Sequence, residues 1–369
     1  MAEFKRDCKS FREDYACEVM TAEGLKDCSG CMFYEPISKK ILLIKLGALG
    51  DILRTTPLLF ALKKKYGNNC HITWLVDEGE GKDILKNNSN IDKILVSNHQ
   101  TILRLKHEKF NILINLDIDQ KATLVANEVR AEEKLGYYFN EDGKPSFFNK
   151  SSEYYLNRVF SNYLNKTNRK TYQEMIFEIA ELPYNKEESV ISNIDKNYAN
   201  EFMKKHDLTK KDKIICINLG SSDRWPSKAW HQDNIIELTK KLKKEGYKVL
   251  IRGGPNEEGL LEEVFLRVKG KDVFSNLPEI LPISKLTALL SLCDRVITGD
   301  TLVLHIAIAL RKKTIALFFC TPPWEIEGYG VVKKLISPLL DQNFYTDSYD
   351  KKLTKSISAL EVFKAIKNG

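Results

Sequence analysis

The chain repeats one pattern along most of its length: a short apolar run, a turn that contains glycine, and a stretch with helical spacing. In the first clear example, the apolar residues 39–46 (KKILLIKL) are followed by the turn 47–51 (GALGD) and by apolar residues at helical intervals up to Gly67. A continuous apolar run of this kind is typical of a strand that is buried on both faces of a parallel sheet. Repeated alternation of such strands with helices predicts βαβ units, and therefore an α/β fold.

Apolar runs of the same kind occur in both halves of the chain. They lie at residues 70–78, 91–97, 111–117, 212–220, 247–253, 294–300 and 312–320. Residues 184–202 have no strong apolar period, which is typical of a linker. We therefore expect two doubly wound, Rossmann-like domains, residues 39–190 and 191–345, that face each other across a cleft at the carboxyl ends of their strands. Residues 1–38 precede them as a Cys-rich appendage, and residues 346–369 carry a last amphipathic helix.

The composition agrees with a folded protein of more than one domain, because 369 residues exceed what one hydrophobic core usually supports. Hydrophobic residues make up 43% and charged residues 29%, which argues against disorder. No apolar stretch reaches the roughly 18 residues that span a bilayer, and the first twenty residues have no apolar leader, so we expect a cytoplasmic protein. The net charge of +7 suits an anionic substrate or a peripheral position at the inner membrane, and no nucleic-acid motif accompanies it.

A phosphate-binding turn is predicted late in the chain, at Gly299, Asp300 and Thr301. These residues lie between an apolar run and a helical stretch, where exposed backbone N–H groups and the positive end of the helix dipole attract anions. His305 follows Thr301 by one helical turn, where it can donate a hydrogen bond to a phosphate or a sugar. An ordinary helix cap followed by a buried histidine has the same pattern, and that alternative stays open here.

Two further glycine turns in the second half are candidates for the same ligand. The first offers small hydrogen-bonding groups and cations that stabilise a diphosphate without a metal: Gly220, Ser221, Ser222, Arg224 and Lys228. In the second, residues 252–258, we expect Glu258 to bind ribose hydroxyls, with Glu257 as the alternative and helix capping as the competing role. Neither turn matches GxGxxG or GxxxxGK(S/T), which argues against ordinary dinucleotide and P-loop sites.

Four segments together resemble glycosyltransferase family 9, the ADP-heptose:lipopolysaccharide heptosyltransferases. They are residues 42–64, 217–230, 249–258 and 296–310, in the order and at the separations of that family. The resemblance covers about residues 40–365 and implies a GT-B fold with metal-independent, inverting transfer. It also implies that the C-terminal helix returns to pack on the N-terminal domain.

The resemblance assigns roles to particular residues. The aspartate of the family's GxxGD motif falls on Asp51, as the general base that takes a proton from the acceptor hydroxyl. The acceptor-side loop that precedes it contains Gly47, Ala48 and Gly50. The turn at residues 299–301 and His305 correspond to family residues near the donor diphosphate.

The chain departs from the family pattern at two positions. Leu302 stands where the family usually has glycine, and its backbone N–H can still bind the donor. Asp223 stands where a lysine is usual, which leaves open whether Arg224 or Lys228 meets the phosphate.

Four of the eight cysteines lie in the first 31 residues: Cys8, Cys17, Cys28 and Cys31. In a cytoplasmic protein such a set favours a tetrahedral metal site over disulfides. We expect structural zinc there, with iron, an iron–sulfur cluster or free thiols as alternatives. For catalysis itself we expect no cofactor. The other four cysteines stand singly among apolar residues, as buried small hydrophobes do.

The sequence therefore predicts an inverting glycosyltransferase that moves heptose, or a related sugar, from ADP-heptose to a hydroxyl of a glycan, a lipid core or a protein. One alternative is a GT-B transferase that uses a UDP- or GDP-sugar. Another is an inactive module that only binds a nucleotide sugar. Transfer or hydrolysis of the donor distinguishes an enzyme from such a module.

Overall fold

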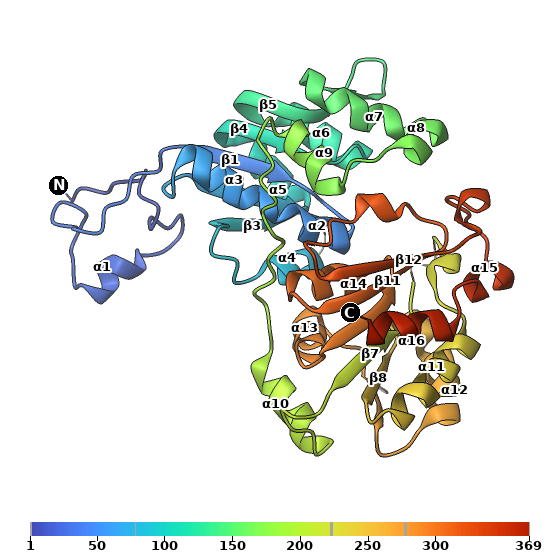
Figure 1. Cartoon of the computed structure of the whole chain (residues 1–369). Coiled ribbons are helices and arrows are strands. Elements are labelled where there is room, and N and C mark those ends of the chain that lie inside the picture. The colour runs from blue at the N-terminus through green and yellow to red at the C-terminus, as the bar shows by residue number, and fades with distance from the viewer. Residues whose placement is uncertain (1, 78, 222–223, 277–278, 369) are drawn as a thin grey trace.

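The structure, a computed structural model, describes residues 2–77, 79–221, 224–276 and 279–368 and contains two α/β domains (Figure 1). The N-terminal domain contains β1 (Lys40–Ile44), α2 (Leu49–Thr55), α3 (Pro57–Tyr66), β2 (His71–Val76), α4 (Gly79–Leu85), β3 (Lys93–Val96), α5 (His99–His107), β4 (Lys109–Asn115), α6 (Gln120–Glu128), β5 (Arg130–Phe139), β6 (Pro145–Phe147), α7 (Glu153–Val159), α8 (Asn162–Thr167) and α9 (Tyr172–Ile179).

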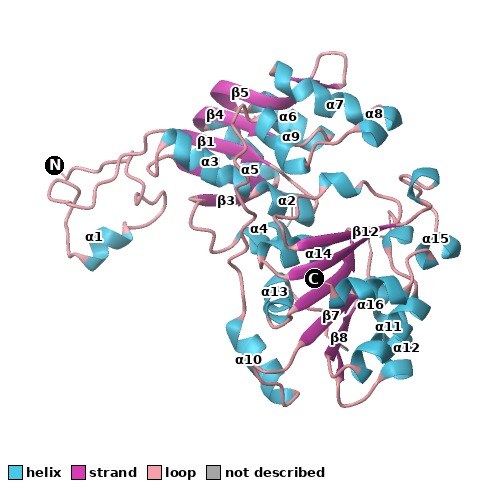
Figure 2. Ribbon diagram, viewed as in Figure 1, coloured by secondary structure: helices cyan, strands magenta, loops and turns pink. Residues whose placement is uncertain are grey.

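The C-terminal domain begins with a helix that leads into a second sheet. It contains α10 (Lys196–Lys205), β7 (Ile214–Asn218), α11 (Gln232–Lys244), β8 (Lys248–Arg252), α12 (Glu258–Val268), β9 (Val273–Ser275), α13 (Ile283–Ser291), β10 (Arg295–Gly299), α14 (Leu302–Ala309), β11 (Lys313–Phe318), β12 (Val332–Ile336), α15 (Lys351–Lys355) and α16 (Ala359–Lys367). In both domains helices flank the sheet, as the colouring by secondary structure shows (Figure 2).

The two sheets have the same strand order. The strand order is β3-β2-β1-β4-β5-β6 in the first and β12-β11-β10-β7-β8-β9 in the second. Only β5 and β6 pair antiparallel among the described strands. Each order reverses beside its first strand, between β1 and β4 and between β7 and β10, and such switch points are where open α/β sheets bind ligands. The predicted α/β class with two doubly wound domains is therefore confirmed.

Strand β1 shows why its sequence is apolar throughout. Ile41 and Leu43 belong to the cluster that contains α2 and α3, whereas Leu42 and Ile44 pack with residues of α5 and α6. All four side chains are fully buried. A central strand covered by helices on both faces has no position for a polar side chain between its ends.

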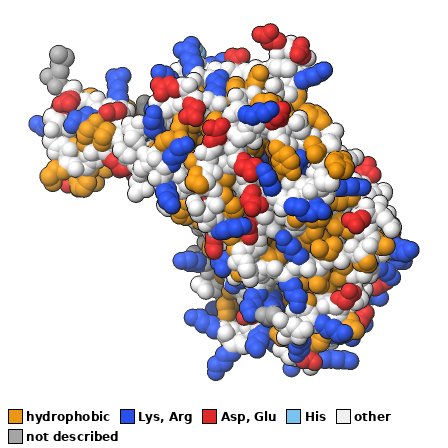
Figure 3. All heavy atoms as spheres, turned by 45° about the horizontal axis from the view of Figure 1, so that its top comes forward, with side chains coloured by type: hydrophobic (Ala, Val, Ile, Leu, Met, Phe, Trp, Pro, Cys, Tyr) orange, Lys and Arg blue, Asp and Glu red, His pale blue; other side chains and the backbone are white. Residues whose placement is uncertain are grey.

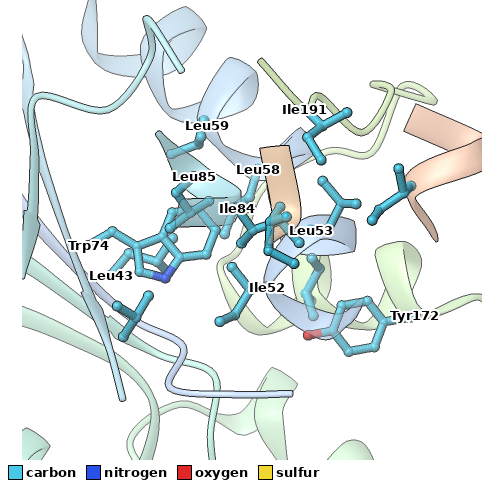
Figure 4. Packing of buried hydrophobic residues seen from close by; sticks show 14 of the residues in the cluster. Leu43, Ile52, Leu53, Leu58, Leu59, Trp74, Ile84, Leu85, Tyr172 and Ile191 are labelled. Atoms are coloured by element: carbon cyan, nitrogen blue, oxygen red, sulfur yellow. The ribbon is translucent and has the colours of Figure 1, made fainter. Parts of the chain in front are cut away.

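The domains touch through apolar helices near the cleft. Residues of α2 and α4, including Ile52 and Ile84, lie side by side (Figure 4) and belong to one buried cluster with Leu289 of α13 and Ile306 of α14. Helix α2 packs against α14, and α4 against α13. The N-terminal domain is thus held against α14 of the C-terminal domain.

The C-terminal helix corrects one expectation. Residues of α15 and α16, among them Leu353, Val362 and Ile366, pack into the C-terminal domain against α11 and β11. Trp230 donates a hydrogen bond through Nε1 to the carbonyl of Ile357 at 2.9 Å. The prediction that this helix packs on the N-terminal domain is wrong, because the apolar face of α11 already offers a matching surface close by.

The appendage, residues 2–38, projects from the N-terminal domain and contains one short helix, α1 (Glu18–Ala22) (Figures 1 and 3). Across the face in Figure 3, Lys and Arg side chains are scattered among acidic and apolar ones. Among the described residues, no helix combines the length and the apolar character needed to cross a membrane.

Candidate functional site

The carboxyl ends of β1 and β4 lie next to each other and carry a charged cluster. Lys45, which follows β1, forms an ion pair with Asp117, which follows β4. The Nζ atom of Lys45 also lies 3.8 Å from Oδ2 of Asp51, in the first turn of α2. Burial opposes the charge on Lys45, but the carboxylate of Asp117 outweighs it and raises the pKa of the lysine. Lys45 therefore brings a permanent positive charge to the loop that carries Asp51.

Asp51 is also paired within its own helix. Arg54 donates hydrogen bonds to Oδ1 of Asp51 from Nε at 2.9 Å and from an Nη atom at 2.7 Å, and its guanidinium lies 3.8 Å above the ring of Tyr172. Burial alone would raise the pKa of Asp51, but the charges of Arg54 and Lys45 outweigh it and lower that pKa. The side chain is 32% exposed, so an ionised carboxylate remains open to a substrate.

Helix α14 of the other domain begins directly opposite this loop. Gly50 lies so close to it that a Cβ atom on the glycine would stand 2.6 Å from Cδ2 of His305. The loop at residues 47–50, predicted to lie on the acceptor side, and the predicted histidine therefore meet at one interface between the domains. Gly50 is needed there because no side chain fits between α2 and α14.

His305 and Asp300 form the second half of this interface. Nε2 of His305 lies 3.9 Å from Oδ1 of Asp300, and Nζ of Lys228 lies 3.2 Å from Oδ2 of the same carboxylate. Burial and the charge of Arg54 lower the pKa of His305 to about 4, so the imidazole is neutral at neutral pH. Although burial opposes it, the charge of Lys228 helps to lower the pKa of Asp300 to about 2. The cleft thus contains a neutral hydrogen-bonding ring beside a fixed ion pair.

A pocket with about 670 Å³ of empty space opens at the switch point of the C-terminal domain. It is lined by Asn218, Gly220, Ser221, Arg252, Gly254, Pro255, Asn256, Glu257, Asp300, Thr301, Leu302 and Val303. Helix α14 starts at this pocket, and the side chain of Thr301 does not cap it; its hydroxyl interacts instead with Thr298 at 3.1 Å. A helix start without a side-chain cap at a polar pocket is suited to bind an anion.

The pocket distinguishes between two neighbouring glutamates. Glu257 lies along it, accepting hydrogen bonds from the backbone N–H of Gly254 at 2.7 Å and of Ser221 at 3.3 Å. Glu258 begins α12 with an exposed side chain and does not line the pocket. Of the two candidates, Glu257 therefore lines the pocket and Glu258, the one predicted, does not.

The two candidate cations in the turn after β7, Lys228 and Arg224, occupy different positions. Lys228 reaches the cleft through its contact with Asp300, whereas Arg224 is exposed and its guanidinium lies 5.1 Å from the ring centroid of Trp225. The candidate Ser222 lies outside the described residues, as does the unusual Asp223.

A second, smaller pocket lies on the other side of His305. Its 220 Å³ of empty space is lined by Arg54, Gln173, Ser189, His305, Ile308, Glu325, Ile326 and Glu327. Oε1 of Gln173 is buried and has no hydrogen-bond partner among the described residues. Glu325 forms an ion pair with Arg158 of α7, so a buried salt bridge joins the two domains beside this pocket.

The sequence patterns did not single out several of these side chains: Lys45, Arg54, Asp117, Arg252, Glu257 as the preferred glutamate, Arg158 and Glu325. A signal existed for Asp117, because it directly follows the apolar run that forms the neighbour of β1. No local signal marked Arg158 and Glu325, which meet only when the two domains are assembled.

The four N-terminal cysteines lie apart from this site, in the appendage. All four are free thiols. Within the described part of the chain, no group of three or more His, Cys, Asp or Glu side chains already has the arrangement needed to hold a metal ion.

Comparison with known proteins agrees with this geometry. Residues 99–352 match the sequence profile of glycosyltransferase family 9 (heptosyltransferase). Lipopolysaccharide heptosyltransferase 1 of Campylobacter coli is 26% identical over 314 residues, which are 80% of this chain and 89% of that relative.

Solved structures show the same fold. A family 9 glycosyltransferase from Veillonella parvula superposes with a TM-score of 0.70 at 23% identity, over 90% of this chain and 97% of that one. ADP-heptose lipopolysaccharide heptosyltransferase II of Escherichia coli superposes with a TM-score of 0.68 at 15% identity, over 89% and 98% of the two chains.

Proposed function

The chain belongs to glycosyltransferase family 9, and we propose that it transfers heptose, or a related sugar, from ADP-heptose to a hydroxyl of a glycan, lipid-core or protein acceptor. The reaction is a direct displacement that inverts the anomeric carbon and needs no metal ion. The relatives named for lipopolysaccharide heptosyltransfer, one of them with ADP-heptose in its name, support this choice of donor and acceptor class.

Asp51 acts as the general base. The acceptor oxygen attacks the anomeric carbon of the donor, the bond from that carbon to the diphosphate breaks, and the hydroxyl proton passes to the carboxylate of Asp51. The lowered pKa of Asp51 keeps it ionised at neutral pH. General-base catalysis of this kind is worth about 10²- to 10⁴-fold in rate.

The negative charge that develops on the leaving diphosphate is stabilised from the C-terminal domain. The N–H groups at the start of α14, including that of Leu302, point to the pocket in which we place the diphosphate. Lys228 supplies the cation, oriented by Asp300. Neutral His305 offers a hydrogen bond to a phosphate or sugar oxygen, and Glu257 binds the ribose hydroxyls.

One observation carries the proposal: the close approach of Gly50 to His305. It supports a base from one domain and an anion-binding helix from the other acting on a single substrate between them.

The test is the variant Asp51→Asn, which keeps the shape of the side chain and removes its ability to take a proton. We expect ADP to stabilise it against heat as it does the wild type, while heptosyl transfer falls by about 10²- to 10⁴-fold. Asp77→Asn is the control, because Asp77 is an exposed carboxylate that follows the neighbouring strand β2 and pairs with Lys121. Turnover close to that of the wild type in Asp51→Asn would refute the role of this residue.

The nucleotide is tested separately by thermal shift with ADP, UDP and GDP. We expect ADP to raise the melting temperature most, since a ligand that binds only the folded state stabilises it by mass action. A shift with UDP or GDP and none with ADP would contradict the ADP-heptose assignment and leave the base assignment standing.

We further propose that the enzyme meets its acceptor at an anionic membrane surface. Val159, Phe160 and Tyr163, at the junction of α7 and α8, are 48%, 67% and 74% exposed, and the exposed cations Lys166 and Arg169 follow them. Exposed aromatic and basic side chains together favour binding to anionic lipid. We expect wild-type protein to float with vesicles that contain anionic lipid and the double variant Phe160→Ser, Tyr163→Ser to remain unbound; equal binding of both would contradict this.

A further inference from the structure

The appendage buries too little to fold by hydrophobic burial alone. Among residues 2–38, only Cys28 is buried, and α1 contains no buried side chain. Met32 is 92% exposed. Small units that lack a core of their own usually depend on disulfides or a bound metal for stability. Something other than packing must therefore hold these residues together.

The four thiols of the appendage converge on one place. Cys8, Cys17, Cys28 and Cys31 all line a single cavity with about 320 Å³ of empty space, among apolar side chains. The backbone explains the convergence: Cys8 pairs with Pro36 across an isolated bridge, and the N–H of Cys31 donates to the carbonyl of Cys28 in a tight turn at 3.3 Å. The four cysteines of residues 8–31 thus line the same space.

We propose that these four cysteines bind one thiophilic metal ion, zinc or iron, and that the ion holds the appendage folded. Four sulfur ligands are the donor set of structural tetrahedral sites. The thiols lose their protons on binding, and Lys5, which also lines the cavity, offsets part of the resulting negative charge.

Binding requires the sulfur atoms to turn toward the centre of the cavity. Sγ of Cys28 now lies 3.9 Å from Sδ of Met20. A cysteine has one side-chain torsion that moves its sulfur, and we expect rotation between staggered positions to bring the thiols to the ion.

The position of the appendage makes this ion structural. Nζ of Lys9 donates to the carbonyl of Asn68, just before β2, and lies 3.4 Å from Asp92, just before β3. Glu13 pairs with Lys93 at the start of β3, at 2.8 Å. These contacts lie at the amino ends of the strands, whereas Asp51 lies beyond their carboxyl ends. The inference is thus independent of the proposed function.

The experiment is elemental analysis of the full-length protein, purified without added metal or affinity resin that carries metal. We expect about one zinc or iron per chain in the wild type, and less than a tenth of that in Cys28→Ser. The matched control is Cys70→Ser, which removes one thiol from the same half of the chain, where Cys70 is buried before β2. It should retain the metal. A wild type without metal, or Cys28→Ser with a full complement, would overturn the proposal.

A second measurement uses only the wild-type chain, so it does not depend on the folding of a variant. We expect a chelator to accelerate tryptic cleavage at the basic residues of the appendage at least tenfold, zinc or iron to restore protection, and ADP binding to stay unchanged. Unchanged cleavage after the metal is removed, or four thiols recovered as two disulfides, would equally overturn it.

Discussion

Replacing Gly50 with alanine tests the contact on which the arrangement of the cleft depends. The added Cβ atom would lie 2.6 Å from Cδ2 of His305, which is about 0.8 Å inside the shortest ordinary contact of 3.4 Å. Both partners are held in place, since His305 is buried and α2 is packed on α4 and α9. The strain therefore separates α2 from α14 and moves Asp51 relative to the donor.

A misplacement of about 1 Å can cost about 10²-fold in rate. For Gly50→Ala we expect the rate of transfer to fall about 10- to 100-fold, with a loss of about 1–3 kcal/mol in unfolding free energy from overpacking. ADP binding should change less, because the pocket proposed for the donor lies within the C-terminal domain.

The assay is steady-state transfer together with thermal unfolding, with Gly259→Ala as the control. Gly259 lies in α12, and a Cβ atom there would meet nothing within 4 Å. Its alanine variant should match the wild type in turnover. If Gly50→Ala transfers sugar at the wild-type rate, the two helices are not in functional contact and the reasoning fails.

Three further predictions concern single groups. Because His305 has a pKa of about 4 in the folded chain and an ordinary value of 6.5, the unfolded chain binds more protons between these values, so stability falls as the pH is lowered through this window. His305→Gln should flatten that fall in melting temperature, and an unchanged slope would contradict it. Glu257→Gln should raise the dissociation constant of ADP about tenfold, the equivalent of about 1.4 kcal/mol, whereas the exposed Glu258→Gln should leave it unchanged; titration calorimetry decides between them. Arg158→Met leaves the buried carboxyl of Glu325 without its partner and should cost about 3–5 kcal/mol in a denaturant titration, and a loss below 1 kcal/mol would show that the salt bridge does not hold the domains.

The central strands were predictable because each is an apolar run, and most of these runs end close to glycine, asparagine or aspartate. The strands that escaped prediction are β5, β6, β9 and β12, which lie at the edges of their sheets or, for β5, next to an edge strand. Strand β5 shows the reason: its first half carries Arg130, Glu132, Glu133 and Lys134, with exposed or half-buried side chains. Half of this strand lacks a complete cover of helices, so its sequence lacks the continuous apolar character used for the others.

The residues of the candidate site also differ in whether the sequence could predict them. Asp51, Asp300 and His305 could be named from motifs, since each is placed by the end of its own strand and the start of its own helix. The choice of Glu257 over Glu258 could not be made, because it depends on which side of the turn after β8 faces Gly220. Arg158 and Glu325 are 167 residues apart in the chain and meet only in the assembled protein.

By itself, the sequence determined the two parallel sheets, the glycine turns at their carboxyl ends, and the residue types available for acid–base and anion chemistry, because each of these follows from local periodicity. Only the tertiary structure decided which of these turns face each other, which cation reaches Asp300, and where the last helix packs. Those outcomes depend on the fit of surfaces that lie far apart in the chain, and residue spacing within one segment carries no information about that fit.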